Sequence, residues 1–436
     1  MIIYLLEILF VLFLFRLGRK NKCYYVLCGL QALSFILAPL VDNHVHFDSA
    51  TTIFNVFYCF AILSLIIVPW SYANFNQVHI KDKSFFSFYK RCLYFVLTLT
   101  ILNNLVVLII VVLFIPDIAT FKASQGFHEL YDRIPYFGLS FRYTSVSRYI
   151  GFMAMPIWIY YLSVGKMKEA RKALIMSSAT LVAAIAFYSR AQILIYSIMI
   201  VCMFLLTSSS ITKNISHRIG KILKYAIITI VGIFSIITVL RFSGMDYYGE
   251  RIPSSSLIQN PILYSIVDYT SKGFPQGIDQ LELHESDDLL YGESCVQSLA
   301  MVLSYFHLID WSADGYSERA QKVYRKSGLG EQNDEGSFHG YTCRMVKNFG
   351  YILTFFFNLL YFLFVKAQAK GKKNISLGML TILTFFLVEP LNAIFYMDYD
   401  MMSFPLLFYI LISFFNFFRM PKVRRTQYVK TVSSCK

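Results

Sequence analysis

Charged residues are scarce in this chain, and that scarcity decides its broad class. Of its 436 residues, 15% are charged, whereas 56% are hydrophobic and 17% are aromatic. Soluble domains carry about a quarter charged residues, so this composition is typical of a membrane protein. The charges that are present are mostly basic and give a formal net charge of +14.

Several motifs of soluble enzymes and metal sites are also missing. The sequence has no P-loop, GxSxG, HExxH or Rossmann fingerprint, and no His or Cys cluster with the spacing of metal ligands. Its eight cysteines are scattered, and only Cys295 and Cys343 share a polar segment. These two residues form either a disulfide or, as we favour, two free thiols. We expect no metal and no other cofactor.

Apolar runs predict the membrane spans. The amino terminus lacks the basic leader and cleavage site of a signal peptide, so the first run is expected to be a retained span. A membrane helix needs about 20 apolar residues, with roughly 17 as the lower limit. We expect an all-α, polytopic bundle of about eleven spans at 2–15, 23–41, 51–73, 92–116, 147–165, 173–189, 191–208, 225–240, 348–365, 375–397 and 401–418.

One apolar run is too long for a single membrane span. Residues 173–207 would form a single helix of about 52 Å, too long for a bilayer core of about 30 Å. Both flanks of the run are basic, which places them on one side of the membrane. A hairpin that turns at Ser189-Arg190 satisfies both constraints.

The placement of the basic residues indicates the topology. Alternate loops hold 26 of the 40 Lys and Arg residues and only two acidic ones. By the positive-inside rule this side is cytoplasmic, so the amino terminus is outside and the carboxyl terminus inside. The net positive charge is therefore explained without nucleic acid. These basic segments lie at 16–22, 81–91, 166–172, 213–224, 366–373 and 419–436.

The longest external loop covers residues 242–347 and has an acidic balance. It contains its own apolar run at 296–311, which we expect to be a partly buried or interfacial helix. Loops of this length usually carry function. The expected domains are 1–241 with spans 1–8, 242–347 as an external loop with short helices, 348–418 with spans 9–11, and 419–436 as a basic cytoplasmic tail.

Ionisable residues near membrane depth are the candidates for function, because burying them is costly. The alternative for cations at helix ends is snorkelling to the headgroups. Arg190, in the hairpin turn, is expected to hold an anion in an aqueous cavity, or else to snorkel or pair with Glu389. Of Arg142 and Arg148, one is expected to be functional. Arg241, at the end of the eighth span, fits snorkelling and function about equally.

A second group precedes the ninth span. His339 can accept a proton near neutral pH, and the Arg344 fork of donors suits phosphate. Tyr341 and Lys347 accompany them. Three acidic residues follow later in the chain. Glu389, beside Pro390, is a general base, a sugar ligand or, as we favour, the partner of an arginine. Asp398 and Asp400 are expected to be solvated.

These features together resemble the O-antigen polymerase and ligase superfamily, specifically the Wzy-type repeat-unit polymerases, whose bundle is GT-C-like. The resemblance rests on the span number, the late external loop, the external arginines and two short motifs. His339 lies eleven residues before Gly350, and Tyr188-Ser189-Arg190 is similar to the Ser-Arg hairpin of these proteins. Two positions depart from the motif: Gly340 replaces a small polar residue, and Leu353 stands where a second Gly is expected.

The resemblance implies a metal-independent glycosyl transfer between two undecaprenyl-pyrophosphate-linked oligosaccharides, at the periplasmic face of the bacterial inner membrane. Membrane lipid is an expected partner, and a chain-length regulator protein is a further candidate. A lipid-linked oligosaccharide flippase or other transporter, an O-antigen ligase and a membrane acyltransferase are the rival functions. We assign Arg190 and Arg344, with Arg142 or Arg148, to the pyrophosphate and His339 to the attacking hydroxyl. His339, Arg344 and Arg190 are therefore the expected catalytic residues, and the expected substrate contacts are Arg142, Arg148, Arg241, Lys347, Glu389 and Tyr341.

Overall fold

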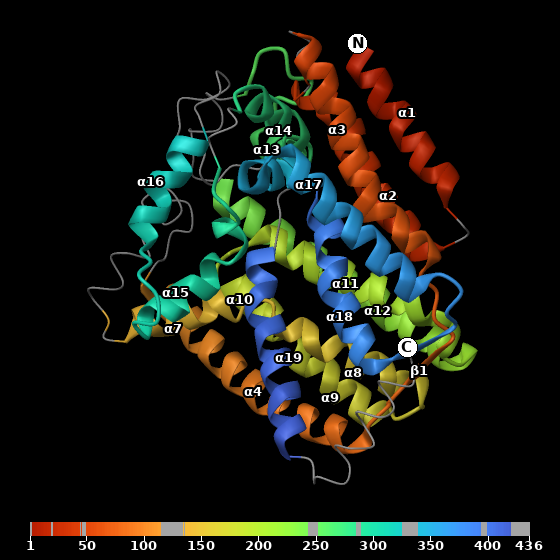
Figure 1. The fold of residues 1–436 in the computed structure, drawn as a ribbon. Coiled ribbons are helices and arrows are strands. Elements are labelled where there is room, and N and C mark those ends of the chain that lie inside the picture. Colours follow the sequence, from red (N-terminus) through yellow and green to blue (C-terminus); the bar gives the residue numbers. More distant parts are fainter. Residues whose placement is uncertain are drawn as a thin grey trace.

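A computed structural model shows an almost wholly helical protein (Figure 1). The described strands, β1 (Gln77–His79) and β2 (Asn374–Ser376), have three residues each. The structure describes residues 2–18, 21–43, 45, 49–114, 134, 136–242, 252–284, 289–324, 339–393 and 399–419.

The amino-terminal helices follow the predicted apolar runs, and two of them begin at clear caps. The side-chain oxygen of Asn21 accepts hydrogen bonds from the backbone N–H groups of Cys23 and Tyr24, and Ser49 forms a capping box with Thr52. The helices, with the 3-10 turns that extend two of them, are α1 Ile2–Leu17, α2 Lys22–Leu37, η1 Ala38–Val41, α3 Ala50–Ile67, η2 Val68–Tyr72 and α4 Lys83–Phe114.

The middle of the chain contains the predicted hairpin. Helix α10 ends at Ala186, Tyr188 takes a left-handed φ of 48°, and α11 begins at Arg190, so the division of the long apolar run is confirmed. The fifth predicted span is shorter than expected, because 3-10 structure fills its first turn. The elements here are α7 Phe137–Val146, η3 Ile150–Met153, α8 Ala154–Ser163, α9 Met167–Ser177, α10 Ala179–Ala186, α11 Arg190–Thr207, η4 Ser208–Ser210 and α12 Lys213–Phe242.

Short helices occupy the described parts of the 242–347 segment. The apolar run at 296–311 yields a helix of nine residues, about 14 Å long at 1.5 Å per residue and too short to span a bilayer. In Figure 1, α13 and α14 lie beside the beginning of α17. These helices are α13 Pro261–Ser271, α14 Gly273–Glu282, η6 Glu293–Cys295, α15 Gln297–Tyr305 and α16 Ala313–Val323.

The last three helices are α17 Gly340–Ala369, α18 Leu377–Asn392 and α19 Tyr399–Arg419. The predicted start of the ninth span at residue 348 needs correction, because α17 begins at Gly340. Its first ten residues are mostly buried in protein, and a kink at Gly350 (φ 70°, ψ 173°) separates them from the lipid-exposed remainder. A hydropathy pattern detects only that remainder, because the first part is polar.

Length and composition identify five helices of the described chain that can cross a membrane, and three shorter apolar helices accompany them. The protein is therefore all-α and membrane-embedded. The count of eleven spans and the side on which each terminus lies stay predictions. The five helices are Lys22–Val41, Ala50–Tyr72, Lys83–Phe114, Arg190–Ser210 and Gly340–Ala369, and the shorter ones are Ile150–Ser163, Leu377–Asn392 and Met402–Asn416.

Loops predicted to share the basic side are joined in the structure. Strands β1 and β2 pair in parallel, with Gln77 opposite Asn374, and so link two of these loops. Lys90 links a third, because its Nζ donates to the Tyr161 hydroxyl at 2.9 Å and lies 3.7 Å from Glu169. We call this end of the bundle the strand end, and the opposite end, near α13 and α14, the site end.

Candidate functional site

Arg190 opens α11 with its side chain inside the protein. The residue is 4% exposed, and its guanidinium carbon lies 4.9 Å from the centre of the Tyr269 ring on α13. A guanidinium over an aromatic face gains cation–π attraction, which is stronger away from water. Snorkelling does not describe Arg190, because protein covers the side chain.

A short series of contacts connects Arg190 to the beginning of α17. Gly273, four residues after Tyr269, has its carbonyl oxygen 3.0 Å from where a β-carbon on Gly340 would stand. The Tyr341 N–H donates to the Ala393 carbonyl at the end of α18, at 3.1 Å. Helices α11, α13, α17 and α18 therefore converge at the site end.

His339, Tyr341 and Lys347 are all buried at the beginning of α17, and Arg344 is half-buried. The His339 ring stacks on that of Tyr324, with centroids 5.1 Å apart and planes 12° from parallel. The charge of Arg344 acts on Tyr324 as well. Burial raises the pKa of the Tyr324 hydroxyl, and Arg344 opposes that rise.

The stretch around His339 is held in place by α14. A β-carbon on Gly277 would collide with the His339 carbonyl oxygen, so only glycine allows the two helices to approach this closely. Lys347 is held by its backbone, since its carbonyl accepts from the Leu290 N–H at 2.9 Å. Residues 325–338, which precede His339, lie outside the described residues.

Glu389 belongs to a buried group of hydroxyls. It is fully buried within α18 and acts electrostatically on Tyr341 and Tyr399. The Tyr341 hydroxyl donates to the Asn358 side-chain oxygen at 2.7 Å and lies 3.0 Å from the Tyr399 hydroxyl. Phenolic groups with other partners close by can orient a carboxylate or a sugar hydroxyl.

Arg148 lies across the hairpin that carries Arg190. Its guanidinium carbon is 4.8 Å from the centre of the Phe187 ring. With the Gln192 amide turned so that its oxygen faces Arg148, Nη1 and Nε donate to it at 2.6 and 3.1 Å. The charge of Arg148 also acts on Asp400. Arg148 therefore packs against the hairpin, with the Asp400 carboxylate within its electrostatic reach.

Asp400 is buried, so the expectation that it is solvated was wrong. Its carboxylate accepts from the Ser298 N–H at 2.5 Å and from the Ser298 hydroxyl at 2.6 Å. A carboxylate at the amino terminus of a helix, here α15, is stabilised by the N–H groups and the helix dipole. The sequence could not indicate this contact, because 102 residues separate the two partners.

The other predicted residues are not gathered with this group. Arg142 is exposed on α7, six residues before the half-buried Arg148. Helix α7 ends at Val146, so Arg142 is on this helix and Arg148 is in the turn before η3. The Arg241 side chain lies outside what the structure describes.

An apolar groove of about 470 Å³ opens beside the buried hydroxyls. It follows α17 from Met345 and Phe349 to Phe364, and Phe386 of α18 lines it as well. Cys295 and Tyr399 mark its polar border. Ligand pockets of this size usually bind apolar molecules through a few polar contacts.

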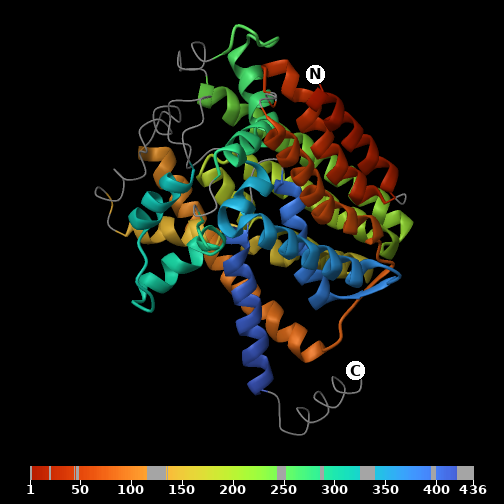
Figure 2. The same cartoon turned by 45° about the horizontal axis from the view of Figure 1, so that its top comes forward.

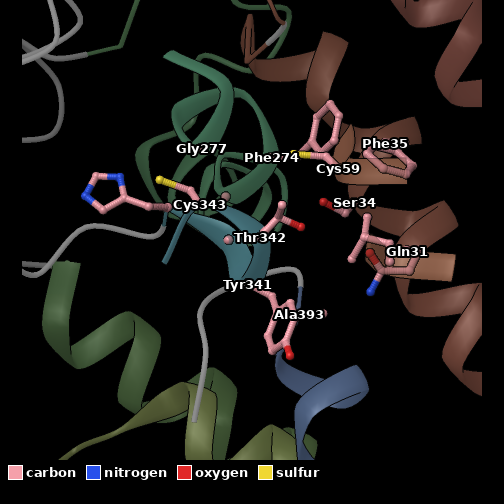
Figure 3. Close-up of a pocket in the computed structure, with 14 residues that line it drawn as sticks. Gln31, Ser34, Phe35, Cys59, Phe274, Gly277, Tyr341, Thr342, Cys343 and Ala393 are labelled. Carbon is pink, nitrogen blue, oxygen red and sulfur yellow. The ribbon is translucent and has the colours of Figure 1, made fainter. Parts of the chain in front are cut away.

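A second cavity, of about 20 Å³, lies between α2 and the beginning of α17 (Figure 3). The Thr342 side chain points toward Ser34 in this view, and Gln31 is next to it. The Thr342 hydroxyl, which is close to the Cys59 thiol, and the Gln31 amide nitrogen are both buried. The volume suits one water molecule bonded to these polar groups.

The two cysteines of the polar segment are free thiols. Burial raises the pKa of Cys295 to about 12, and the charges of Glu389 and Asp400 add to the rise. Cys295 is therefore a thiol at neutral pH and is poorly suited to nucleophilic chemistry. Among the described residues, no group of three His, Cys, Asp or Glu side chains could hold a metal ion.

Sequence reasoning missed several residues of this site, chiefly aromatic and amide side chains. A detectable signal existed for one: Asn358 is a lone amide in the apolar run of α17, and polar groups at such depth are costly. No local signal distinguishes the others from ordinary neighbours of a helix end. The missed residues are Gln192, Tyr269, Tyr324, Asn358, Tyr399 and Asp400.

Comparisons of this chain with protein-family models, with curated proteins and with solved structures find no match. Function is therefore inferred from the side chains at the site end and from the groove beside them.

Proposed function

We propose that this protein polymerises undecaprenyl-pyrophosphate-linked oligosaccharide repeat units by glycosyl transfer. This glycosyl transfer would occur at the periplasmic face of the bacterial inner membrane, with the site end of the bundle on the periplasmic side. One observation supports this most: Arg190 and Lys347, 4% and 0% exposed, lie inside a membrane-embedded bundle at the same end as an apolar groove. A lipid diphosphate needs this combination of cations and apolar surface.

The arginines would stabilise the leaving group. When the pyrophosphate departs, negative charge develops on its oxygen atoms, and preorganised cations lower the energy of that state. Arg190, which opens α11, and Arg148, which contacts Phe187 and Gln192 of the same hairpin, suit the diphosphate, and Arg344 suits it from α17. Guanidinium groups are matched to phosphate by their fork of donors.

The acceptor hydroxyl would be activated by a second group of residues. A sugar hydroxyl attacks the anomeric carbon, a new C–O bond forms, and the bond to the pyrophosphate oxygen breaks with its electron pair. His339 would take the hydroxyl proton as general base, with Tyr324 fixing the plane of its ring. Glu389, with Tyr341 and Tyr399 near it, would bind sugar hydroxyls.

The groove would hold part of the polyprenyl chain. Its aromatic walls belong to α17 and α18, and its polar border includes Tyr399, whose hydroxyl meets that of Tyr341. A lipid lying there would bring its diphosphate toward the buried cations. The expected orientation follows the positive-inside rule, because three of the predicted basic loops meet at the strand end.

Purified protein in lipid nanodiscs, supplied with a synthetic lipid-linked repeat unit, tests the proposal. A ladder of products is expected, and Arg190→Ala should reduce its rate about 100-fold, the usual loss for one electrostatic stabiliser. Arg91→Ala is the matched control, because Arg91 is exposed on α4 and bonds only to Ser87 among described contacts. Equal ladders from the two variants would contradict the proposal.

The same preparation separates the rival functions. A single addition to a lipid A–core acceptor without a ladder would indicate a ligase. Movement of a labelled lipid-linked oligosaccharide across vesicles without new glycosidic bonds would indicate a flippase or transporter.

A further inference from the structure

The end of α15 presents a compact apolar surface outside the membrane helices. Its members, Tyr305, Phe306, Leu308 and Ile309, are between 41% and 69% exposed. We call them the α15 tip. Exposed apolar side chains that adjoin one another mark interaction sites when they are not scattered singly.

The tip is ordered by its backbone. His307 takes a left-handed φ of 56°, the Leu308 N–H donates to the Leu303 carbonyl at 3.0 Å, and the His307 N–H donates to the Ser304 carbonyl at 2.9 Å. This pair of bonds is a Schellman motif, which ends a helix in a fixed conformation. The Ser304 hydroxyl also donates to the Trp311 carbonyl at 2.6 Å. The apolar side chains are thus held outward.

Two contacts place helix α15, which carries the tip, beside the membrane helices. Ser298, at the other end of α15, is clamped by Asp400 in the first turn of α19. Helix α15 also contacts α7, which packs against α4. In both overall views the teal helix α15 lies on the same flank as α7 (Figure 1, Figure 2).

The lipid-facing surface continues through these neighbours. The last residues of α4, Val112 to Phe114, are exposed and apolar, as are Tyr136 and Leu139 at α7. Helix α4 is one of the candidate spans, so its final turn lies in or at the edge of lipid. The tip therefore lies on the same flank of the protein as an apolar surface that faces the bilayer.

We propose that the α15 tip inserts into the bilayer interface around the site end, so that the segment after α14 is anchored to the membrane as well as to α19. Aromatic side chains such as Tyr305 and Phe306 favour the boundary between headgroups and acyl chains, about 5–10 Å deep. The tip contains no Lys or Arg, so its insertion depends on apolar burial and needs no anionic lipid.

Brominated lipids test this insertion, because bromine quenches tryptophan within a short distance. Phe306→Trp is compared with the parent protein in nanodiscs of zwitterionic lipid brominated near the headgroup or deep in the chain. The added tryptophan should be quenched about three-fold more by the shallow bromines than by the deep ones. Trp70, Trp158 and Trp311 are common to all variants and are subtracted.

Gln321→Trp is the matched control. Gln321 is exposed on α16, an external helix whose amino-acid composition is polar, so its tryptophan should show no quenching by either lipid. No quenching at position 306 would overturn the proposal. Efficient cross-linking between tips of two copies, in place of lipid quenching, would overturn it too and would identify a subunit interface. Neither outcome depends on polymerase activity.

Discussion

The two parts of α17 on either side of Gly350 occupy different environments. Before the kink, His339 at the helix cap, Tyr341 and Lys347 are buried against α14, the segment at Leu290 and the end of α18. After it, large apolar side chains face outward, with Ile352 73% exposed. One continuous element therefore changes from a polar helix inside protein to an apolar helix in lipid.

This difference shows how the chain places costly groups near a membrane. A buried cation is tolerated where other protein groups surround it, and an apolar side chain needs only lipid. The first part of α17 therefore depends on long-range contacts, whereas the outward face of the second part depends on composition alone. Substitutions should have large effects in the first part and at buried positions of the second, and small effects at the exposed positions of the second.

The largest effect is expected where α14 meets the first part of α17. Gly277→Val forces a side chain against the His339 carbonyl, so the helices must separate. We expect a loss of about 3 kcal/mol in unfolding free energy, the upper range for overpacking. Thermal unfolding in nanodiscs measures it. Gly29→Ala, in open space on α2, is the control and should leave the melting temperature unchanged or slightly higher.

A smaller loss is expected for the amide that joins the two parts. Asn358→Leu removes the acceptor of the Tyr341 hydroxyl and should cost about 2 kcal/mol, because a buried donor loses one partner. Leu360→Ile, at an exposed position of the same part, should stay within about 0.5 kcal/mol of the parent. Equal melting temperatures for both variants would remove the distinction between buried polar and lipid-facing positions.

The kink itself can be tested by a conservative change. Gly350→Ala meets no neighbouring atom, but its φ of 70° and ψ of 173° suit only glycine. We expect a cost of between about 1 and 2 kcal/mol, or a straighter helix if the strain is relieved. Spin-label distances between the two parts of α17 measure the bend. Gly232→Ala in α12, at an ordinary helical position in open space, should change neither quantity.

The smallest effect concerns α16, the helix directly before Tyr324, whose ring stacks on His339. Arg319 of α16 hydrogen-bonds to Glu293 at 2.9 and 2.5 Å and lowers the pKa of that carboxyl. A lowered pKa means that the pair stabilises α16 at neutral pH and loses its effect as the pH falls through that lowered pKa. Hydrogen exchange in α16, corrected for intrinsic rates, should therefore accelerate modestly in acid.

Two variants check the origin of this pH dependence. Glu293→Gln should exchange at neutral pH as the parent does in acid. Glu318→Gln, an exposed carboxyl on the same helix, should keep the dependence of the parent. Persistence of the dependence in Glu293→Gln would show that another group causes it.

Much of the fold could be predicted because lipid imposes a simple requirement on composition. The apolar runs located the principal helices, and the basic flanks of residues 173–207 located the Arg190 hairpin. The site was less accessible to prediction. His339, Arg344 and Glu389 were identified as candidates because they are ionisable groups near helix ends. Asp400 was expected in solvent, because no residue near it in the sequence indicates its contact with Ser298.

The sequence by itself determined that this is a helical membrane protein with cations at the ends of its spans, because hydropathy and charge are local properties. Only the tertiary structure decided which cations are buried, that α17 begins ten residues before its kink, and that Tyr269, Tyr324 and Tyr399 surround the polar group. Those outcomes depend on contacts between distant segments, whose free energies no local pattern contains.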